Sequence, residues 1–270
     1  MKRRELLPLL APLLTGAPAI LAQGLPSKIE QRGRAIVSEA LAALGGDKFL
    51  AMQDRRELGR AYSFHNTRIS GLARAKISVR YLLPTDGQLA LRERQSFGSK
   101  EKELDQAYTL YLEDGKIWDV TFRGAREMDP TMRERYKLST LHNVLYILRQ
   151  RLQEKGLIIE HRGGDVVDYR PVEIVDFTDS ENRVTTVNFH RTTKLPVRQK
   201  FLRRNAAKLQ DEEVTSFDKY RDVGDGVKWP YVVERFRNGE KQFEMLAEKV
   251  EINLGLLDNI FSLPASVEIL

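Results

Sequence analysis

The sequence contains no cysteine among its 270 residues. This absence excludes a disulfide framework, a zinc site built on thiolates and a lipid-modified cysteine. The fold must therefore be stabilised by its own hydrophobic core. Apolar residues make up 41% of the chain and charged residues 30%, a balance typical of a globular protein that can build such a core.

Residues suited to metal binding and catalysis are also scarce. The four histidines are His65, His142, His161 and His190. No two of them have metal-pair spacing on a helix or strand, so we predict no metal site and no cofactor. The sequence lacks a Gly-x-Ser-x-Gly motif and a phosphate-binding Gly-x-x-x-x-Gly-Lys-Ser/Thr motif. Asp176, Asp179 and Glu181 are more typical of a solvated turn than of an acid–base pair. We therefore predict no catalytic residues and a protein that is not an enzyme.

A long apolar run occurs only near the N-terminus. Basic residues precede an apolar stretch from Leu6 to Leu21, and Ala22 offers a small residue for cleavage. This pattern predicts a signal peptide over residues 1–23, cleaved near Ala22, and a periplasmic mature chain without a stable membrane span. An anchor that is never cleaved is disfavoured, because three prolines and a glycine interrupt the stretch. Removing residues 1–23 lowers the net charge from +6 to +4, too small a surplus to predict nucleic-acid binding.

Most of the remaining sequence alternates between apolar and polar residues, which is the period of half-buried antiparallel strands. Asn238-Gly239 lies between two such segments and is a strong hairpin signal. Gly163-Gly164 is interpreted as another turn between strands. The predicted strands cover approximately residues 57–65, 74–82, 88–97, 107–112, 116–122, 157–161, 166–177, 183–190, 196–204, 212–222, 227–237 and 241–252.

Two regions have helical patterns. Ser27-Lys-Ile-Glu30 has the form of a capping box and starts a helix that ends at Gly45-Gly46. Asp129-Pro130 predicts the start of a helix over residues 131–138, and an apolar stripe predicts a second helix over 140–154. A large sheet tends to curl, and helices are the available cover for its apolar face. We therefore predict an α+β fold: a single large, strongly curved antiparallel sheet, an unclosed barrel, with helices covering its concave face.

Three further segments carry a family resemblance. Residues 187–198 read Val-Asn-Phe-His-Arg-Thr-Thr-Lys-Leu-Pro-Val-Arg, residues 217–230 read Phe-Asp-Lys-Tyr-Arg-Asp-Val-Gly-Asp-Gly-Val-Lys-Trp-Pro, and residues 261–264 read Phe-Ser-Leu-Pro. Together with the helix that ends at Gly46, this order resembles the outer-membrane lipoprotein-sorting and periplasmic lipoprotein-carrier superfamily. The resemblance implies one carrier-like domain over residues 24–270, with a helical lid and a hydrophobic cavity for acyl chains. No position here matches the carriers' lid-holding arginine, so no residue role is transferred.

One face of the early strands is apolar and, with the second predicted helix, forms the expected cavity lining. We expect a void of roughly 300 Å³ or more there, the lower range for ligand pockets. The alternative is a filled core, because aromatic residues at strand spacing usually pack together. The candidate lining residues are Ile77, Val79, Tyr81, Leu89, Leu91, Tyr108, Leu110, Trp118, Val120, Leu145 and Leu148.

The opposite face of the same strands is basic. Arg74, Lys76 and Arg80 alternate along one strand, and Arg92 and Arg94 lie on the next. If the intervening turn pairs these strands, the five residues form a basic patch that could dock anionic head groups or an acidic partner. The alternative is an ordinary solvated outer face.

The predicted function follows from fold and compartment. We expect a periplasmic binding or carrier protein for a lipid, a lipoprotein acyl chain or another amphiphile. The alternative is an envelope protein-interaction or stress-sensing module that transports no ligand. An enzyme on the same scaffold is less favoured, because no motif requires one.

Overall fold

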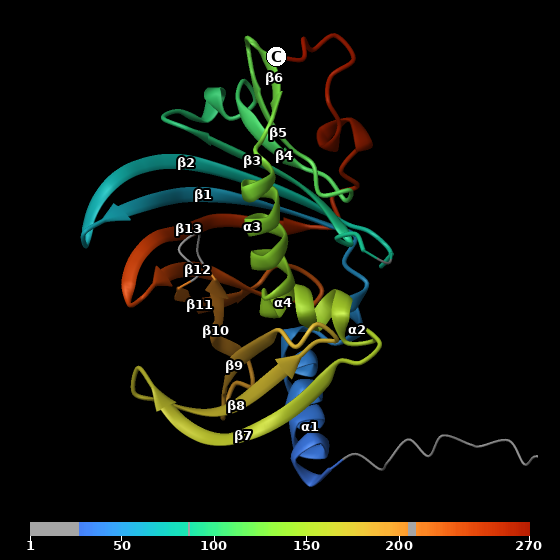
Figure 1. The fold of residues 1–270 in the computed structure, drawn as a ribbon, viewed down its shortest axis with the longest axis vertical. Coiled ribbons are helices and arrows are strands. Elements are labelled where there is room, and N and C mark those ends of the chain that lie inside the picture. The colour runs from blue at the N-terminus through green and yellow to red at the C-terminus, as the bar shows by residue number, and fades with distance from the viewer. Residues whose placement is uncertain (1–26, 86, 205–208) are drawn as a thin grey trace, which may run out of the picture.

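The computed structural model describes residues 27–85, 87–204 and 209–270, so the predicted signal peptide lies outside the described residues. The described strands form one antiparallel sheet of thirteen strands, in the order β6-β5-β4-β3-β2-β1-β13-β12-β11-β10-β9-β8-β7. Its terminal strands, β6 and β7, each pair with one neighbouring strand, so the sheet curves without closing into a barrel (Figure 1). The predicted α+β class and the single curved sheet are confirmed.

The sheet consists of two sequential meanders. The first contains β1 (Asp54–His65), β2 (Arg68–Tyr81), β3 (Leu91–Gly98), β4 (Tyr108–Tyr111), β5 (Ile117–Thr121) and β6 (Gly124–Glu127). The second contains β7 (Ile158–Val167), β8 (Arg170–Thr178), β9 (Val184–His190), β10 (Pro196–Arg204), β11 (Gln210–Asp222), β12 (Lys228–Arg237) and β13 (Glu240–Ile252). The two meanders join where β1 pairs with β13. The short 3-10 helices η1 (Glu101–Glu103) and η3 (Asp258–Phe261) lie outside the strands.

The first predicted helix is confirmed as α1 (Lys28–Leu44). The Ser27 hydroxyl accepts a hydrogen bond from the amide of Glu30 at 3.1 Å, which satisfies one of the free N–H groups of the first turn. Gly45 and Gly46 both have positive φ angles, of 121° and 56°, and end the helix as predicted. A short helix, α2 (Asp47–Leu50), follows directly.

The central helical region differs from the prediction of one helix over residues 140–154. The structure has α3 (Pro130–Leu141), then α4 (Val144–Tyr146), then a π-helical turn, η2 (Ile147–Arg151). Asn143 separates them: its backbone is extended, and its side-chain oxygen accepts from the amides of Leu145 and Tyr146 at 2.9 and 3.3 Å. An asparagine side chain competes for backbone amides in this way, so it starts a new helix rather than continuing the old one.

The interpretation of Gly163-Gly164 as a turn is wrong. Both glycines lie inside β7, where the register with β8 shifts between His161 and Gly163. A bulge of this kind suits glycine, and Gly163 has a φ of 100°. The turn itself is at Asp168 and Tyr169, which both have positive φ angles. By contrast, Asn238-Gly239 forms the predicted hairpin turn between β12 and β13.

The main hydrophobic core lies between the helices and one half of the sheet. It combines residues of α1, α4 and η2 with residues from β7 to β13, among them Ile36, Leu44, Leu148, Phe177 and Phe189. α3 crosses the concave side of the sheet in front of the central strands (Figure 1). The helices therefore cover the concave face, as predicted. No helix in the described part of the chain is long and apolar enough to cross a membrane.

The C-terminal segment covers a different part of the sheet. Leu263 and Val267 pack against Leu110, Val120 and Ala125 of β4 to β6. The amide of Ala125 donates to the carbonyl of Glu268 at 2.7 Å, so the segment also pairs with the outer edge of β6. This contact protects one of the two terminal strands of the open sheet.

Candidate functional site

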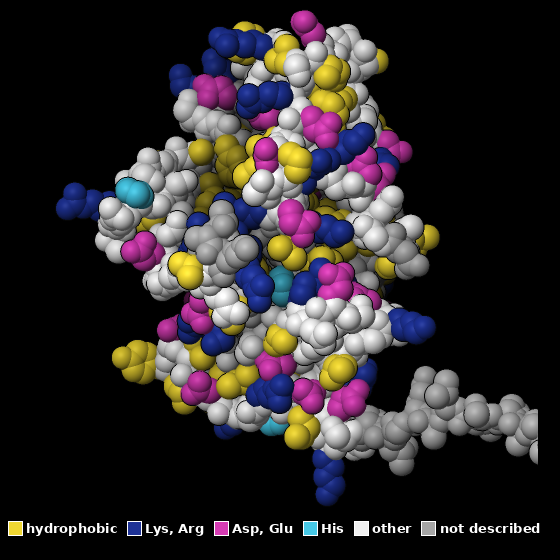
Figure 2. Space-filling view, in the orientation of Figure 1, with side chains coloured by type: hydrophobic (Ala, Val, Ile, Leu, Met, Phe, Trp, Pro, Cys, Tyr) yellow, Lys and Arg dark blue, Asp and Glu magenta, His cyan; other side chains and the backbone are white. Residues whose placement is uncertain are grey.

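A cavity of about 400 Å³ lies between the concave face of the sheet and the α3–α4 region. Figure 2 shows the surface hollowed and lined with hydrophobic side chains beside α3. Strands of both meanders contribute to it, because β1, β13 and β12 are neighbours at the centre of the sheet. The apolar wall includes Ile77, Val79, Leu91, Ile117, Leu145, Phe217, Val233 and Met245.

The structure brings part of the predicted lining together. Ile77, Val79, Tyr81 and Leu91 line the cavity from β2 and β3, because β2 and β3 pair Val79 with Glu93 and Tyr81 with Leu91. Leu145 lines it from α4. Two other candidates lie nearby but inside packed clusters.

These two residues are Leu89 and Leu148. Leu89 packs beside Val79 and Tyr146 and is 3% exposed, and Leu148 is fully buried in the main core. Neither contributes to the cavity wall.

The candidates on β4 and β5 lie apart from the cavity. Leu110 and Val120 form a small buried cluster with Ala125, and Tyr108, Trp118 and the C-terminal residues Leu263 and Val267 pack against that cluster. Successive side chains on a strand point to opposite faces, so the intervening residues Thr109 and Tyr111 are the ones that line the cavity. Both faces of these strands carry bulky residues. The sequence alone did not reveal that a distant C-terminal segment covers one of them.

The floor of the cavity holds a buried ion pair. Arg55 and Glu57 are two residues apart on β1, and their side chains form a salt bridge with about 10% of each side chain exposed. The indole N–H of Trp229 donates to Glu57 at 3.3 Å, and the Arg55 guanidinium lies 4.1 Å from the centre of the Trp229 ring. These contacts offset part of the cost of burying both charges, while the buried Nε of Arg55 has no hydrogen-bond partner among the described residues.

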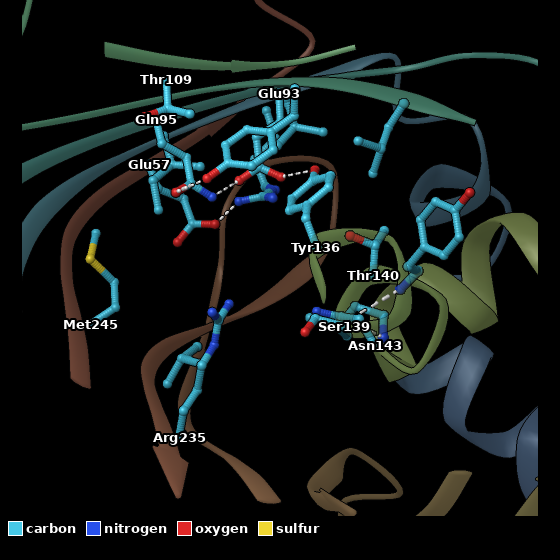
Figure 3. Close-up of a pocket in the computed structure, with 18 of the residues that line it drawn as sticks. Glu57, Glu93, Gln95, Thr109, Tyr136, Ser139, Thr140, Asn143, Arg235 and Met245 are labelled. Atoms are coloured by element: carbon cyan, nitrogen blue, oxygen red, sulfur yellow. Dashed lines mark hydrogen bonds and ion pairs between the residues drawn. The ribbon is translucent and has the colours of Figure 1, made fainter. Parts of the chain in front are cut away.

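A polar network occupies the sheet side of the cavity (Figure 3). The hydroxyl of Tyr136 on α3 donates to Glu93 at 2.8 Å, and the amide of Gln95 donates to the same carboxylate at 2.5 Å. The ring of Tyr136 stacks on Tyr111 at 3.9 Å. Burial, followed by the charge of Glu93, raises the pKa of both tyrosine hydroxyls, so they stay protonated donors. This network ties α3 to β3 and β4.

The mouth of the cavity carries two exposed arginines, Arg135 on α3 and Arg235 on β12. Figure 3 shows the side chain of Arg235 extending from β12 toward the space below β1 and β3. Sequence reasoning missed both residues, because charged residues on a helix or strand are usually interpreted as a solvated face. It also missed the Arg55–Glu57 pair and the Glu93 network.

The five residues of the predicted basic patch do share one face. β2 and β3 place Arg80 opposite Arg92, and Ser78 opposite Arg94. Every one of the five lies within ion-pair distance of a carboxylate, so the face is largely neutralised rather than strongly basic. The pairs are Arg74 with Glu248, Lys76 and Arg94 with Asp105, Arg80 with Asp258, and Arg92 with Glu113.

Sequence comparison identifies no relative: no family model matches the chain, and no curated protein matches it. Comparison with solved structures finds proteins of the same fold. A domain described as an outer membrane lipoprotein-sorting protein domain from Vibrio parahaemolyticus matches with a TM-score of 0.57 at 10% identity, covering 86% of this chain and 97% of that one. The chain shares the fold of this domain.

Two further solved structures share the fold. A protein described as a LolA superfamily protein from Nitrosomonas europaea matches with a TM-score of 0.53 at 8% identity, covering 85% of this chain and 97% of that one. A DUF1329 family protein from Desulfovibrio piger matches with a TM-score of 0.58 at 12% identity, covering 85% of this chain and 96% of that one. These identities are low, so the likeness is one of architecture. Within the described residues, no group of three or more side chains is arranged to hold a metal ion.

Proposed function

We propose that the protein is a periplasmic binding or carrier protein that holds the apolar part of a lipid, a lipoprotein acyl chain or another amphiphile in this cavity. The observation that supports the proposal most directly is the cavity itself, with its apolar wall between a curved sheet and a helical cover. A volume of about 400 Å³ lies in the range of ligand pockets, roughly 300–1,000 Å³. The fold shared with lipoprotein-sorting domains supports the same class of ligand.

The cavity volume also favours a small ligand. About 400 Å³ is near the lower end of the ligand-pocket range, so the space suits one acyl chain better than a lipid with several chains. Three contacts hold α3 against the sheet: the hydrogen bond from Tyr136 to Glu93, the stacking of Tyr136 on Tyr111, and the ion pair of Arg133 with Glu127 of β6. Opening these contacts would enlarge the entrance without disturbing the main core, which lies beneath α1, α4 and η2.

Filling the cavity tests the proposal. An environment-sensitive neutral apolar dye should bind the folded protein saturably. Val79→Trp should weaken that binding by occupying the space, because Val79 lines the cavity and is 2% exposed. The control is Val166→Trp, at a position that is 64% exposed and far from the cavity lining. It should bind the dye as the unmodified protein does.

A folded protein with no saturable dye binding would overturn the carrier proposal. It would favour the alternative of an envelope protein-interaction or stress-sensing module. Circular dichroism of each variant establishes that the domain is folded before binding is compared.

The periplasmic location is tested separately. N-terminal sequencing of protein isolated from the native host should begin at Gln23 or Gly24. Protein that retains Met1 in the cytosol would contradict both the location and the transport role.

A further inference from the structure

Four arginines gather beside the mouth of the cavity, and we call them the arginine rim. They are Arg135 on α3, Arg203 on β10, and Arg235 and Arg237 on β12. Three of them lie on the concave face, on β10 and β12 with β11 between these strands, and α3 supplies the fourth from the helical cover.

The strand register shows how the rim relates to the apolar wall. β11 and β12 pair Phe217 with Val233, and both residues line the cavity. Two residues further along β12, on the same face, Arg235 lies opposite Thr215, and Arg237 follows two residues later. The concave surface of β12 therefore changes from apolar to cationic within a few residues.

Half of the rim is neutralised within the protein. Arg203 and Arg237 both donate to one carboxylate oxygen of Glu213, at 2.6 and 3.0 Å. Arg203 also lies 3.9 Å from Asp211.

The other half has no such partner. Across the described residues, no carboxylate lies within ion-pair distance of Arg135 or Arg235. Partial burial of its guanidinium lowers the pKa of Arg135, and the charges of Arg237, Arg203 and Arg235 lower it further against the opposing charge of Glu213. An added anion would relieve this mutual repulsion.

The remaining charged residues of the cavity do not supply that anion. Glu57 is paired with Arg55 at the floor. Glu93 accepts hydrogen bonds from Tyr136 and Gln95 on the sheet side. The positive charge without a carboxylate partner thus lies at the mouth, next to solvent, and the apolar residues Phe217 and Val233 follow it on the same face of the sheet.

We propose that Arg135 and Arg235 bind the anionic head group of a single-chain amphiphile whose acyl chain lies along the apolar wall. The head group is a carboxylate or a phosphate, since the planar guanidinium fork can donate two hydrogen bonds to a pair of oxygens of either group. This inference rests on the proposed carrier function and specifies the head-group chemistry of its ligand.

A ligand series with one chain length separates the head group from the chain. Dodecanoate, dodecyl phosphate, dodecanol and dodecylamine are each titrated, below the micelle concentration or solubility limit of each, against the purified protein loaded with the neutral apolar dye. The two anionic ligands should displace the dye roughly tenfold more effectively than the alcohol, because a hydrogen bond to a charged group contributes at least that factor. The amine should be the weakest of the four. A difference between dodecanoate and dodecyl phosphate identifies which anion the rim prefers.

A paired substitution assigns the preference to the rim. Arg135→Gln combined with Arg235→Gln should bring the affinity for dodecanoate down to that for dodecanol and leave dodecanol unchanged. Arg68→Gln combined with Arg123→Gln removes the same charge from two exposed arginines that do not line the cavity, and should keep the anion preference.

The outcomes distinguish this inference from the function on which it rests. Equal affinity for the acid, the alcohol and the amine would overturn the head-group inference while leaving the carrier function standing. The head-group inference would also be overturned if the control variant with Arg68→Gln and Arg123→Gln lost the preference for anionic ligands and the rim variant kept it. Long-range charge, rather than Arg135 and Arg235, would then be responsible for the preference. No binding of the dye or of any chain to folded protein would refute both.

Discussion

The buried histidine at the end of α3 makes the stability of this fold sensitive to acid. His142 is 5% exposed, its ring stacks on Phe201 with 4.0 Å between centroids, and its Nδ1 lies 2.7 Å from the hydroxyl of Thr185. Burial, reinforced by the nearby positive charges of Arg183 and Arg151, lowers the pKa of His142 from 6.5 to about 4 against the opposing charge of Asp179. The folded protein therefore keeps this ring neutral where the unfolded chain protonates it.

The direction of the effect follows from proton linkage. As the pH falls from about 6.5 toward 4, the unfolded chain binds a proton that the folded protein excludes, so the free energy of unfolding decreases. The shift corresponds to a loss of about 2 kcal/mol between pH 7 and pH 5, and about 3 kcal/mol by pH 4. Well above pH 6.5 neither the folded nor the unfolded protein binds this proton, so the contribution is complete and no longer changes.

Urea unfolding at pH 7, 5 and 4 measures this contribution. His142→Gln can still hydrogen-bond to Thr185 but does not titrate, so the variant should lose about 2 kcal/mol less than the unmodified protein between pH 7 and pH 5. His65→Gln, at an exposed position, should keep the full pH dependence. If the unmodified protein and His142→Gln show the same change in unfolding free energy over this range, the burial argument for His142 is refuted.

Three further substitutions test the packing that surrounds the cavity. Asn143→Ala removes the side chain that accepts from two amides at the start of α4 and should lower the unfolding free energy by about 1 kcal/mol in urea; unchanged stability would show that α4 needs no cap. Leu148→Ala empties a fully buried core position and should cost about 2–5 kcal/mol, measured in the same way, whereas the exposed Leu202→Ala should have little effect. Gly59→Ala would place a methyl group 2.1 Å from the carbonyl oxygen of Leu246 and should lower the unfolding free energy by roughly 1–3 kcal/mol. Gly71→Ala is the control, because the nearest atom to its added methyl group lies at 3.6 Å. Equal melting temperatures for the two variants would contradict the close approach of β1 to β13 at Gly59.

Local patterns in the sequence predicted much of the architecture. Ser27 and Gly45-Gly46 bound α1 because capping and left-handed backbone depend on the residues themselves. Asn238-Gly239 formed the expected turn for the same reason. Gly163-Gly164 misled, because glycine serves a bulge inside a strand as well as a turn, and only the pairing with β8 distinguishes the two.

The candidate cavity was harder to predict, because its lining depends on contacts between distant segments. Alternation on β2 correctly placed Ile77 and Val79 together. On β4 the same alternation left two possible faces, and the C-terminal segment around Leu263 covers the face that we had expected to point inward. Arg135 and Arg235 lie about a hundred residues apart in the sequence, and only the course of α3 over β12 brings them to one opening. The signal that could have indicated Arg235 is its place in the inward-facing row of β12, after Val233.

The pairing of β1 with β13 has a consequence for how the protein reaches its native state. Each meander contains only short-range pairings and can form from a continuous stretch of chain, but their junction joins Arg55 to Ile252, and the Gln53 amide to the Asn253 side chain 200 positions away. Contacts between such distant positions form slowly, since a long loop must close first. Until the junction forms, β1 and β13 each expose an unpaired strand edge, and a strand from another copy of the chain could pair with either edge. We therefore expect aggregation during refolding to rise steeply with protein concentration, and to stop increasing once β13 has paired with β1.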